Sequence, residues 1–184
     1  MTDSDLSRFL ASGEPFDAWN EEWLGVPLRL QPFFSSELPP REFVGSVRTI
    51  TVCDSGVVVV DHPRPSEPPQ LLAGGHPEAD ESLAEALVRE IAEETGWLVS
   101  PICVFGFVHC RHLDTRRPDW NRPFPEWVDP MFVSRADSFS PDLLKPGETP
   151  SRLVPWTEIG DLPIGEMQTR WLERATELWR ASDS

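Results

Sequence analysis

The feature that most constrains the fold is a stretch near the middle of the chain with the period of an amphipathic helix. Residues 75–97 read G-H-P-E-A-D-E-S-L-A-E-A-L-V-R-E-I-A-E-E-T-G-W. Their apolar face, which we expect in the core, carries Ala84, Leu87, Val88 and Ile91. The neighbouring face carries Glu90, Glu93 and Glu94, which share one arc because a helix turns roughly 100° per residue. The pattern predicts a helix that is buried on one side and densely acidic beside it.

Stacked carboxylates of this kind need a counter-charge. Like charges at this spacing destabilise an isolated helix by about 0.2–0.5 kcal/mol per pair, and by more when partly buried. The only basic residue beside the acidic face is Arg89, near its edge. Two interpretations follow: a solvated acidic surface, or a site for a hard divalent cation such as Mg²⁺, which takes carboxylate and carbonyl oxygens.

The complete spacing resembles the Nudix box, G-x5-E-x7-R-E-U-x-E-E-x-G-U, where U is usually aliphatic. The fixed positions are occupied by Gly75, Glu81, Arg89, Glu90, Glu93, Glu94 and Gly96. Trp97 departs from the aliphatic preference, which affects packing rather than chemistry. Seven matches at fixed spacing are far more specific than a lone glycine motif. The resemblance implies an α/β fold, the Nudix-type α/β/α sandwich with a mixed β-sheet, with a hydrolase domain over residues 43–184.

The resemblance also implies which groups bind one to three Mg²⁺ or Mn²⁺ ions. The expected ligands are the main-chain carbonyl of Gly74 and the carboxylates of Glu90, Glu93 and Glu94. Hydrolysis of a phosphoanhydride depends mostly on alignment and on neutralising the charge of the phosphate oxygens. Glu90 and Glu93 are also candidates to orient or deprotonate the attacking water.

Other residues of the box would support these ligands. By resemblance, Arg89 holds the carboxylates by charge-assisted hydrogen bonds, and Glu81 and Gly75 lie behind them. A purely structural ion pair is the alternative for Arg89 and Glu81. The family often takes a general base from a later loop. The candidates for that base, in order of preference, are Glu148, Glu126 and Asp129, each of which could instead be a surface carboxylate.

The charge and composition of the chain narrow its partners. A net charge of −15 over 184 residues argues against a nucleic-acid partner, because binding a phosphate backbone needs basic patches. A small-molecule nucleotide remains compatible if metal ions neutralise the site. No apolar run approaches 18 residues, and the N-terminus lacks the basic and apolar regions of a signal peptide. We therefore expect no membrane partner and a cytoplasmic protein.

The spacing of the cysteines and of two histidines does not favour a second metal centre. Cys53, Cys103 and Cys110 show no paired spacing, which favours reduced thiols. His109 and His112 are three apart on a predicted strand, so their side chains point to opposite faces. We expect core or rim positions for both histidines.

Residues 1–42 are predicted to form an N-terminal arm. Leu6, Phe9 and Leu10 have helical spacing, and a second short helix could begin at Pro15 and carry Trp19 and Trp23. Residues 26–34 read as an edge strand, since two prolines disfavour a central one. The aromatic residues of the arm would pack on the main domain or against a second subunit, so a homodimer is one arrangement to consider.

The remaining chain alternates strands with loops and ends in a helix. The predicted strands are 43–53, 57–60, 70–73, 98–111 (as one strand or two, interrupted at Pro101 or Gly106), 128–136 and 152–156. The predicted loops are 63–69, 115–127 and 137–150, and an amphipathic helix is predicted over 166–181.

Substrate choice in this family comes from outside the box, and the loop 115–127 has suitable chemistry. Arg117 and Arg122 could bind phosphate, and Trp120 offers a plane on which a base could stack. The alternative for Trp120 is packing over the core.

Two functions are compatible with the sequence. The first is metal-dependent hydrolysis of a phosphoanhydride bond in a nucleoside di- or triphosphate derivative. The second is a non-catalytic module of the same fold that senses a nucleotide. The intact set of Arg89 and three glutamates favours the enzyme, because a sensor would tolerate a degenerate box.

Overall fold

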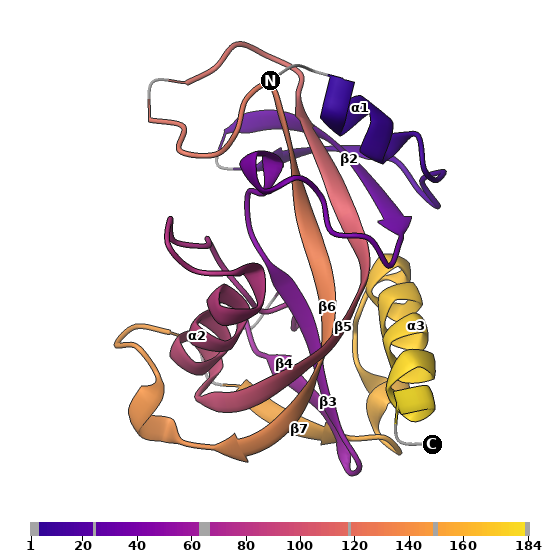
Figure 1. Ribbon diagram of the computed structural model, residues 1–184. Coiled ribbons are helices and arrows are strands. Elements are labelled where there is room, and N and C mark those ends of the chain that lie inside the picture. Colours follow the sequence, from indigo (N-terminus) through magenta and orange to yellow (C-terminus); the bar gives the residue numbers. More distant parts are fainter. Residues whose placement is uncertain (1–3, 24, 63–66, 118, 149–150, 183–184) are drawn as a thin grey trace. The chain divides into compact units, whose positions relative to one another are not determined.

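A computed structural model describes residues 4–23, 25–62, 67–117, 119–148 and 151–182 (Figure 1). In chain order, the helices and strands are α1 Ser4–Leu10, β1 Trp19–Trp23, β2 Val26–Phe34, β3 Arg48–Cys53, β4 Gly56–Val60, α2 Leu83–Thr95, β5 Trp97–His112, β6 Glu126–Phe139, β7 Ser151–Pro155 and α3 Glu166–Ser182. Short 3₁₀ helices are η1 Arg41–Phe43, η2 Pro141–Leu143 and η3 Ile159–Asp161. Parts of the arm and of the three predicted loops lie outside the described residues, namely 1–3, 24, 63–66, 118 and 149–150.

The strands form one mixed sheet in the order β1-β2-β5-β6-β3-β4-β7. The pairs β1–β2, β2–β5, β3–β4 and β4–β7 are antiparallel, whereas the bridge between Val44 and Val128 is parallel. Together with the helices, this sheet confirms the predicted α/β class. Within the described ranges, none of the helices is both long and apolar enough to span a bilayer.

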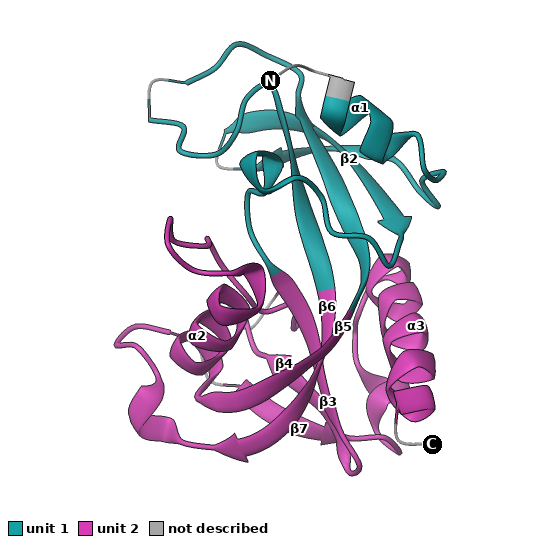
Figure 2. Cartoon of the chain, in the orientation of Figure 1, with its two compact units in different colours: residues 1–47, 104–131 teal, residues 48–103, 132–184 magenta. Residues whose placement is uncertain are grey.

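Two compact units can be distinguished along the chain (Figure 2). Unit 1 comprises residues 1–47 and 104–131, and unit 2 comprises residues 48–103 and 132–184. The arm predicted over 1–42 lies within unit 1. The proposed division into this arm and a hydrolase domain remains a prediction.

In unit 1, residues 19–23 form a strand, so the predicted second helix is wrong. Trp19 and Trp23 are four apart, a spacing that puts two side chains on one face of a helix and also on one face of a strand. Pairing of Trp19 with Leu30 and of Trp23 with Val26 decides in favour of the strand. Both tryptophans pack on a buried cluster that includes Trp120.

β2 lies between β1 and β5, so the predicted edge position is also wrong. Each of its prolines avoids the loss of a ladder hydrogen bond. The carbonyl of Pro27 accepts from the N–H of Leu113, just past the end of β5, and the carbonyl of Pro32 accepts from the N–H of Phe16, just before β1 begins. Because the N–H and C=O of one strand residue point the same way, each missing donor faces a position just past the end of the paired ladder, which stops at Leu28 on the β5 side and at Leu30 on the β1 side.

Unit 2 contains the predicted hairpin, formed by β3 and β4, with β7 pairing along the other side of β4. β3 begins only at Arg48, because η1 and an irregular segment occupy the start of the predicted strand 43–53. Residues 70–73 make two isolated bridges, Gln70 with Val60 and Ala73 with Thr49, instead of the predicted strand.

The later elements follow the predictions closely. β5 is one continuous strand that contains both Pro101 and Gly106, so neither residue interrupts it. α3 buries Trp171, Leu172, Ala175 and Trp179, which confirms its predicted apolar stripe. In Figure 1, α2 and α3 of unit 2 lie on opposite sides of β3, β4 and β7.

Candidate active site

The helix α2 has strong local signals at both ends. At its start, the Ser82 hydroxyl accepts from the Glu85 N–H at 3.2 Å, and the Glu85 carboxylate accepts from the Ser82 N–H at 2.8 Å. At its end, Gly96 takes a left-handed conformation with φ 74°. The buried stripe includes Leu87 and Ile91 as predicted, whereas Ala84 is exposed and Ala86 takes its place in the core.

Arg89 joins three carboxylates of the box. Its guanidinium donates to Glu81 at 2.5 and 3.1 Å, to Glu90 at 2.7 Å and to Glu93 at 3.2 Å. It also donates to the carbonyl of His76 at 3.0 Å. The hydrogen bond to Glu81 is the main reason that the pKa of Arg89 is raised above its usual value.

The turn before α2 lies directly against the acidic face. The Gly74 N–H donates to the Glu94 carboxylate at 2.8 Å, and Gly74 has a φ of 134°, which favours glycine. At Gly75, a Cβ would come within 2.5 Å of the Glu90 Cδ, so no larger side chain fits without moving that carboxylate. Two adjacent glycines therefore let the backbone of the turn approach the carboxylates of Glu90 and Glu94 closely.

Arg48 was not predicted from the sequence, yet it belongs to this site. Its Nη1 donates at 2.8 Å to the carbonyl oxygen of Gly74, the expected main-chain ligand. The contact follows from the bridge between Thr49 and Ala73, which places the residue before Thr49 beside the residue after Ala73. No local pattern around Arg48 indicates this, because the bridge joins segments more than 20 residues apart.

Neighbouring carboxylates of the box differ in their electrostatic environment. Burial raises the pKa of Glu94, and the Gly74 N–H and Arg48 offset this only in part. The pKa of Glu93 is lowered, mainly by a hydrogen bond from Lys145. The Lys145 ammonium lies 2.6 Å from the Glu93 carboxylate. Glu93 thus favours its charged form more than Glu94 does.

Glu148, the preferred candidate for a general base, lines a cavity together with Glu94 of the box. This cavity has a volume of about 240 Å³ and lies in unit 2. The other residues lining this cavity are Arg48, Val60, Asp61, His62, Gln70, Leu72, Ala73 and Glu94. The negative charge of Glu148 also contributes to the raised pKa of Glu94. The two less preferred acids are paired within unit 1, Glu126 with His109 at 2.8 Å and Asp129 with the Ser46 N–H at 2.7 Å.

The predicted substrate-binding residues Arg117, Trp120 and Arg122 all lie in unit 1. Trp120 is only 9% exposed and packs near Trp23 and Trp127, so its ring takes the packing position named as the alternative. The Arg122 guanidinium lies 4.5 Å from the centre of the Trp23 ring, and the Arg117 guanidinium is 3.0 Å from an Asp119 oxygen. A role in binding substrate remains a prediction for the three residues.

Both histidines of the fifth strand are buried, as predicted. His109 pairs with Glu126, whereas His112 lies among the rings of Trp120, Phe124 and Trp127. The three cysteines are free thiols.

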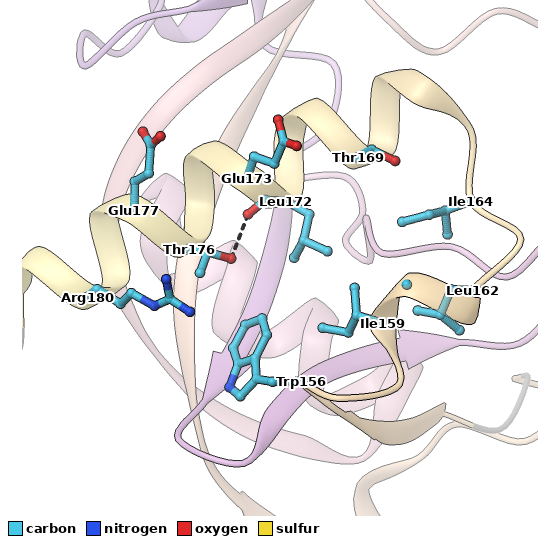
Figure 3. A pocket seen from close by; sticks show the side chains of 11 residues that line it. Trp156, Ile159, Leu162, Ile164, Thr169, Leu172, Glu173, Thr176, Glu177 and Arg180 are labelled. Atoms are coloured by element: carbon cyan, nitrogen blue, oxygen red, sulfur yellow. Dashed lines mark hydrogen bonds between the residues drawn. The ribbon is translucent and has the colours of Figure 1, made fainter.

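A second, larger cavity of about 600 Å³ lies beside α3 (Figure 3). Its walls include Trp156, Ile159, Leu162, Ile164 and Leu172. Among the described residues that line it, none belongs to the box, and one cation, Arg180, stands against the carboxylates of Glu173 and Glu177, so this lining is poorly suited to neutralise a polyphosphate. The smaller cavity next to Glu94 therefore has the better chemistry for the active site.

The box residues fit a divalent cation in donor chemistry. Carboxylates of Glu90 and Glu94 and the carbonyl of Gly74 form an all-oxygen set of the kind that Mg²⁺ and Mn²⁺ prefer. Within the described part of the chain, no three acidic, histidine or cysteine side chains converge as a ready cation site. Glu93 is engaged by Lys145 and Arg89 instead.

The family model for the NUDIX domain matches residues 43–175. The chain belongs to the Nudix family. The protein is therefore a Nudix hydrolase, and the expectation drawn from the box is confirmed. Nudix hydrolases generally use divalent metal ions and act on small-molecule nucleotides, and family membership supports hydrolysis of a pyrophosphate bond.

Solved structures of Nudix hydrolases share the fold. A pyrophosphohydrolase from Bacillus subtilis is 16% identical, with a TM-score of 0.54, and the match covers 91% of this chain and 98% of that chain. A NUDIX hydrolase from Nitrosomonas europaea is 20% identical, with a TM-score of 0.51 and coverage of 76% and 90%. A NUDIX-family hydrolase from Clostridium perfringens is 19% identical, with a TM-score of 0.52 and coverage of 76% and 99%. No curated protein matches this Nudix chain by sequence.

Proposed function

We propose that the protein is a Mg²⁺- or Mn²⁺-dependent hydrolase of the pyrophosphate bond in a nucleoside di- or triphosphate derivative. The observation that carries this proposal is the contact of the Gly74–Gly75 turn with the acidic face of α2. It gathers the carboxylates of Glu90 and Glu94 around the backbone of the turn. Glu93 would complete the set of ligands once it leaves Lys145.

Bound divalent ions would neutralise charge on the phosphate oxygens and lower the pKa of a water molecule. The protein's own contribution is alignment. Arg89 keeps Glu81, Glu90 and Glu93 in one cluster, which limits the rotamers that the ligands can adopt. The closeness of these carboxylates would strengthen cation binding, because a cation relieves their mutual repulsion.

Proton transfer from the attacking water requires a base beside the ligands. Glu148 lines the same cavity as Glu94, which supports it as the group that would accept this proton. Glu90 and Glu93 remain the alternative candidates within the box. A base outside the ligand set keeps its lone pairs available for the proton, which favours Glu148.

The cavity beside the box would take part of the nucleotide. Arg48, Asp61, His62 and Gln70 line it with groups that can form hydrogen bonds to phosphate, sugar or base. A net charge of −15 supports a small-molecule substrate rather than a nucleic acid. A cytoplasmic location and a homodimer remain predictions.

The test is product release over a panel of nucleoside diphosphates, triphosphates and diphosphate-linked compounds. Each compound is incubated with the protein in Mg²⁺, in Mn²⁺ and in EDTA. We expect cleavage of at least one class in the presence of metal and none in EDTA. Tight nucleotide binding without turnover in any metal would contradict the proposal and support the sensing module instead.

A further inference from the structure

Lys145 is the only lysine in a chain that carries 15 arginines. Its ammonium lies 2.6 Å from the Glu93 carboxylate in the acidic face of α2. Lys145 is 54% exposed, and the charge of Glu90 reaches it as well. All the other side chains of the Lys and Arg type in this chain are arginines, so the chemical difference between lysine and arginine is relevant at this position.

The backbone holds Lys145 at the end of α2 independently of its side chain. The N–H of Lys145 donates to the carbonyl of Glu93 at 2.8 Å. On either side in sequence, the Ser140 N–H donates to the Gly96 carbonyl and the Ser151 hydroxyl to the Thr95 carbonyl, both at 2.7 Å. These bonds satisfy carbonyls in the last turn of the helix. The ammonium can therefore leave Glu93 while its backbone stays in place.

We propose that Lys145 pairs with Glu93 until a divalent ion takes that carboxylate, and that the displaced ammonium then contacts the phosphates of the substrate. This inference rests on the proposed function. A lysine suits such an exchange, because its ammonium is a compact point charge on a flexible stem, whereas a guanidinium favours fixed bidentate pairs. Arg89 has the second kind of contact, with two hydrogen bonds to Glu81.

If this exchange takes place, removal of the Lys145 ammonium should have opposite effects on the affinity for the metal ion and on the affinity for a phosphate ligand. Removing the ammonium frees Glu93, so a divalent ion should bind more tightly by about two- to fivefold, the range typical of an exposed ion pair. The same change removes a cation from the phosphates, so a phosphate ligand should bind more weakly by about three- to tenfold. A residue that merely stabilises the loop would weaken both.

The first experiment measures these two affinities without catalysis. Mn²⁺ binding is followed by electron paramagnetic resonance, and binding of methylenediphosphonate, an uncleaved pyrophosphate isostere, by calorimetry in saturating Mg²⁺. The variants are Lys145→Met, the conservative Lys145→Arg, and Arg174→Met as control. Arg174 forms an exposed ion pair with Glu177 at 2.9 Å on α3. We expect opposite shifts for Lys145→Met, partial recovery for Lys145→Arg and no shift for the control.

The second experiment uses the single lysine as a reporter. Acetylation of Lys145 by an N-hydroxysuccinimide ester is quantified by mass spectrometry, with a lysine-containing peptide in the same tube as reference. Mg²⁺ should speed the reaction severalfold, and methylenediphosphonate added with Mg²⁺ should slow it again. An unchanged rate in Mg²⁺, or metal and diphosphonate affinities that shift in the same direction in Lys145→Met, would overturn the inference. Wild-type protein that binds no Mn²⁺ and cleaves no nucleotide would instead overturn the proposed function, and the inference with it.

Discussion

The contact between Gly75 and Glu90 allows a quantitative test of the proposed site. An added Cβ at position 75 would lie 2.5 Å from the Glu90 Cδ and 2.9 Å from its Oε1, whereas ordinary contact begins at 3.4 Å. The Glu90 Oε2 lies closer still, so in Gly75→Ala the carboxylate must retreat by about 1 Å. The backbone at Gly75 does not have a positive φ, so alanine itself is not strained there.

The fold should tolerate this change, because the group that moves is the end of a flexible side chain. Alanine also restricts the unfolded chain, which favours the folded state by about 0.4–1 kcal/mol. The catalytic rate, by contrast, should fall in Gly75→Ala. A displacement of roughly 1 Å in a catalytic arrangement can cost about 10²-fold in rate, which corresponds to about 2.7 kcal/mol of transition-state stabilisation.

The assay combines kinetics with unfolding. kcat and KM are measured for the best nucleotide of the panel over a Mg²⁺ titration, and thermal unfolding is followed without metal. The matched control is Gly160→Ala in η3, because a Cβ at this glycine meets nothing within 4 Å. We expect the rate to fall only in Gly75→Ala, with Tm unchanged or slightly raised in that variant. Turnover within twofold of the wild type at all Mg²⁺ concentrations would refute the assignment of Glu90 to the site.

Further predictions concern the other ligands, the core of unit 1 and pH. Glu93→Gln and Glu94→Gln each remove a charge but keep the shape, so turnover should fall by orders of magnitude while the circular dichroism spectrum persists; near wild-type turnover in saturating Mg²⁺ would disprove the ligand set. Gly45→Ala should lower the free energy of unfolding by about 1–3 kcal/mol in urea titrations, because its Cβ would overlap the buried Trp127 ring. Burial lowers the pKa of His112, so the unfolded state binds its proton more readily and stability should fall as pH drops below about 6.5. His112→Phe should therefore lose less stability between pH 7 and 5.5 than the wild type, and equal losses would exclude this cause.

The acidic helix could be predicted from the sequence because its determinants are local. Ser82 and Glu85 form its first turn, and Gly96 supplies the left-handed residue at its end. The spacing of Glu90, Glu93 and Glu94 places them on one face in any α-helix. Such features depend on neighbours within a few residues, so they can be derived without tertiary structure.

Elements whose pattern fits two structures could not be assigned in this way. The spacing of Trp19 and Trp23 suits a helix or a strand, and only pairing with β2 selects the strand. The prolines of β2 suggested an edge, but the strand is central because β1 and β5 end where the missing donors point. The decisive information in both cases is how a neighbouring strand pairs with the segment, which depends on residues distant in the sequence.

By itself, the sequence determined the α/β class, the helix with its acidic face and the membership of the Nudix family, because these follow from local periodicity and fixed spacing. Only the tertiary structure decided which cationic side chains lie beside the acidic face of α2 and the adjoining Gly74 turn. Arg48 reaches the Gly74 carbonyl through a bridge between distant segments, and Lys145 reaches Glu93 because its loop folds back on the end of α2. Long-range contacts of this kind depend on how separate segments pack, so no spacing along the chain encodes them.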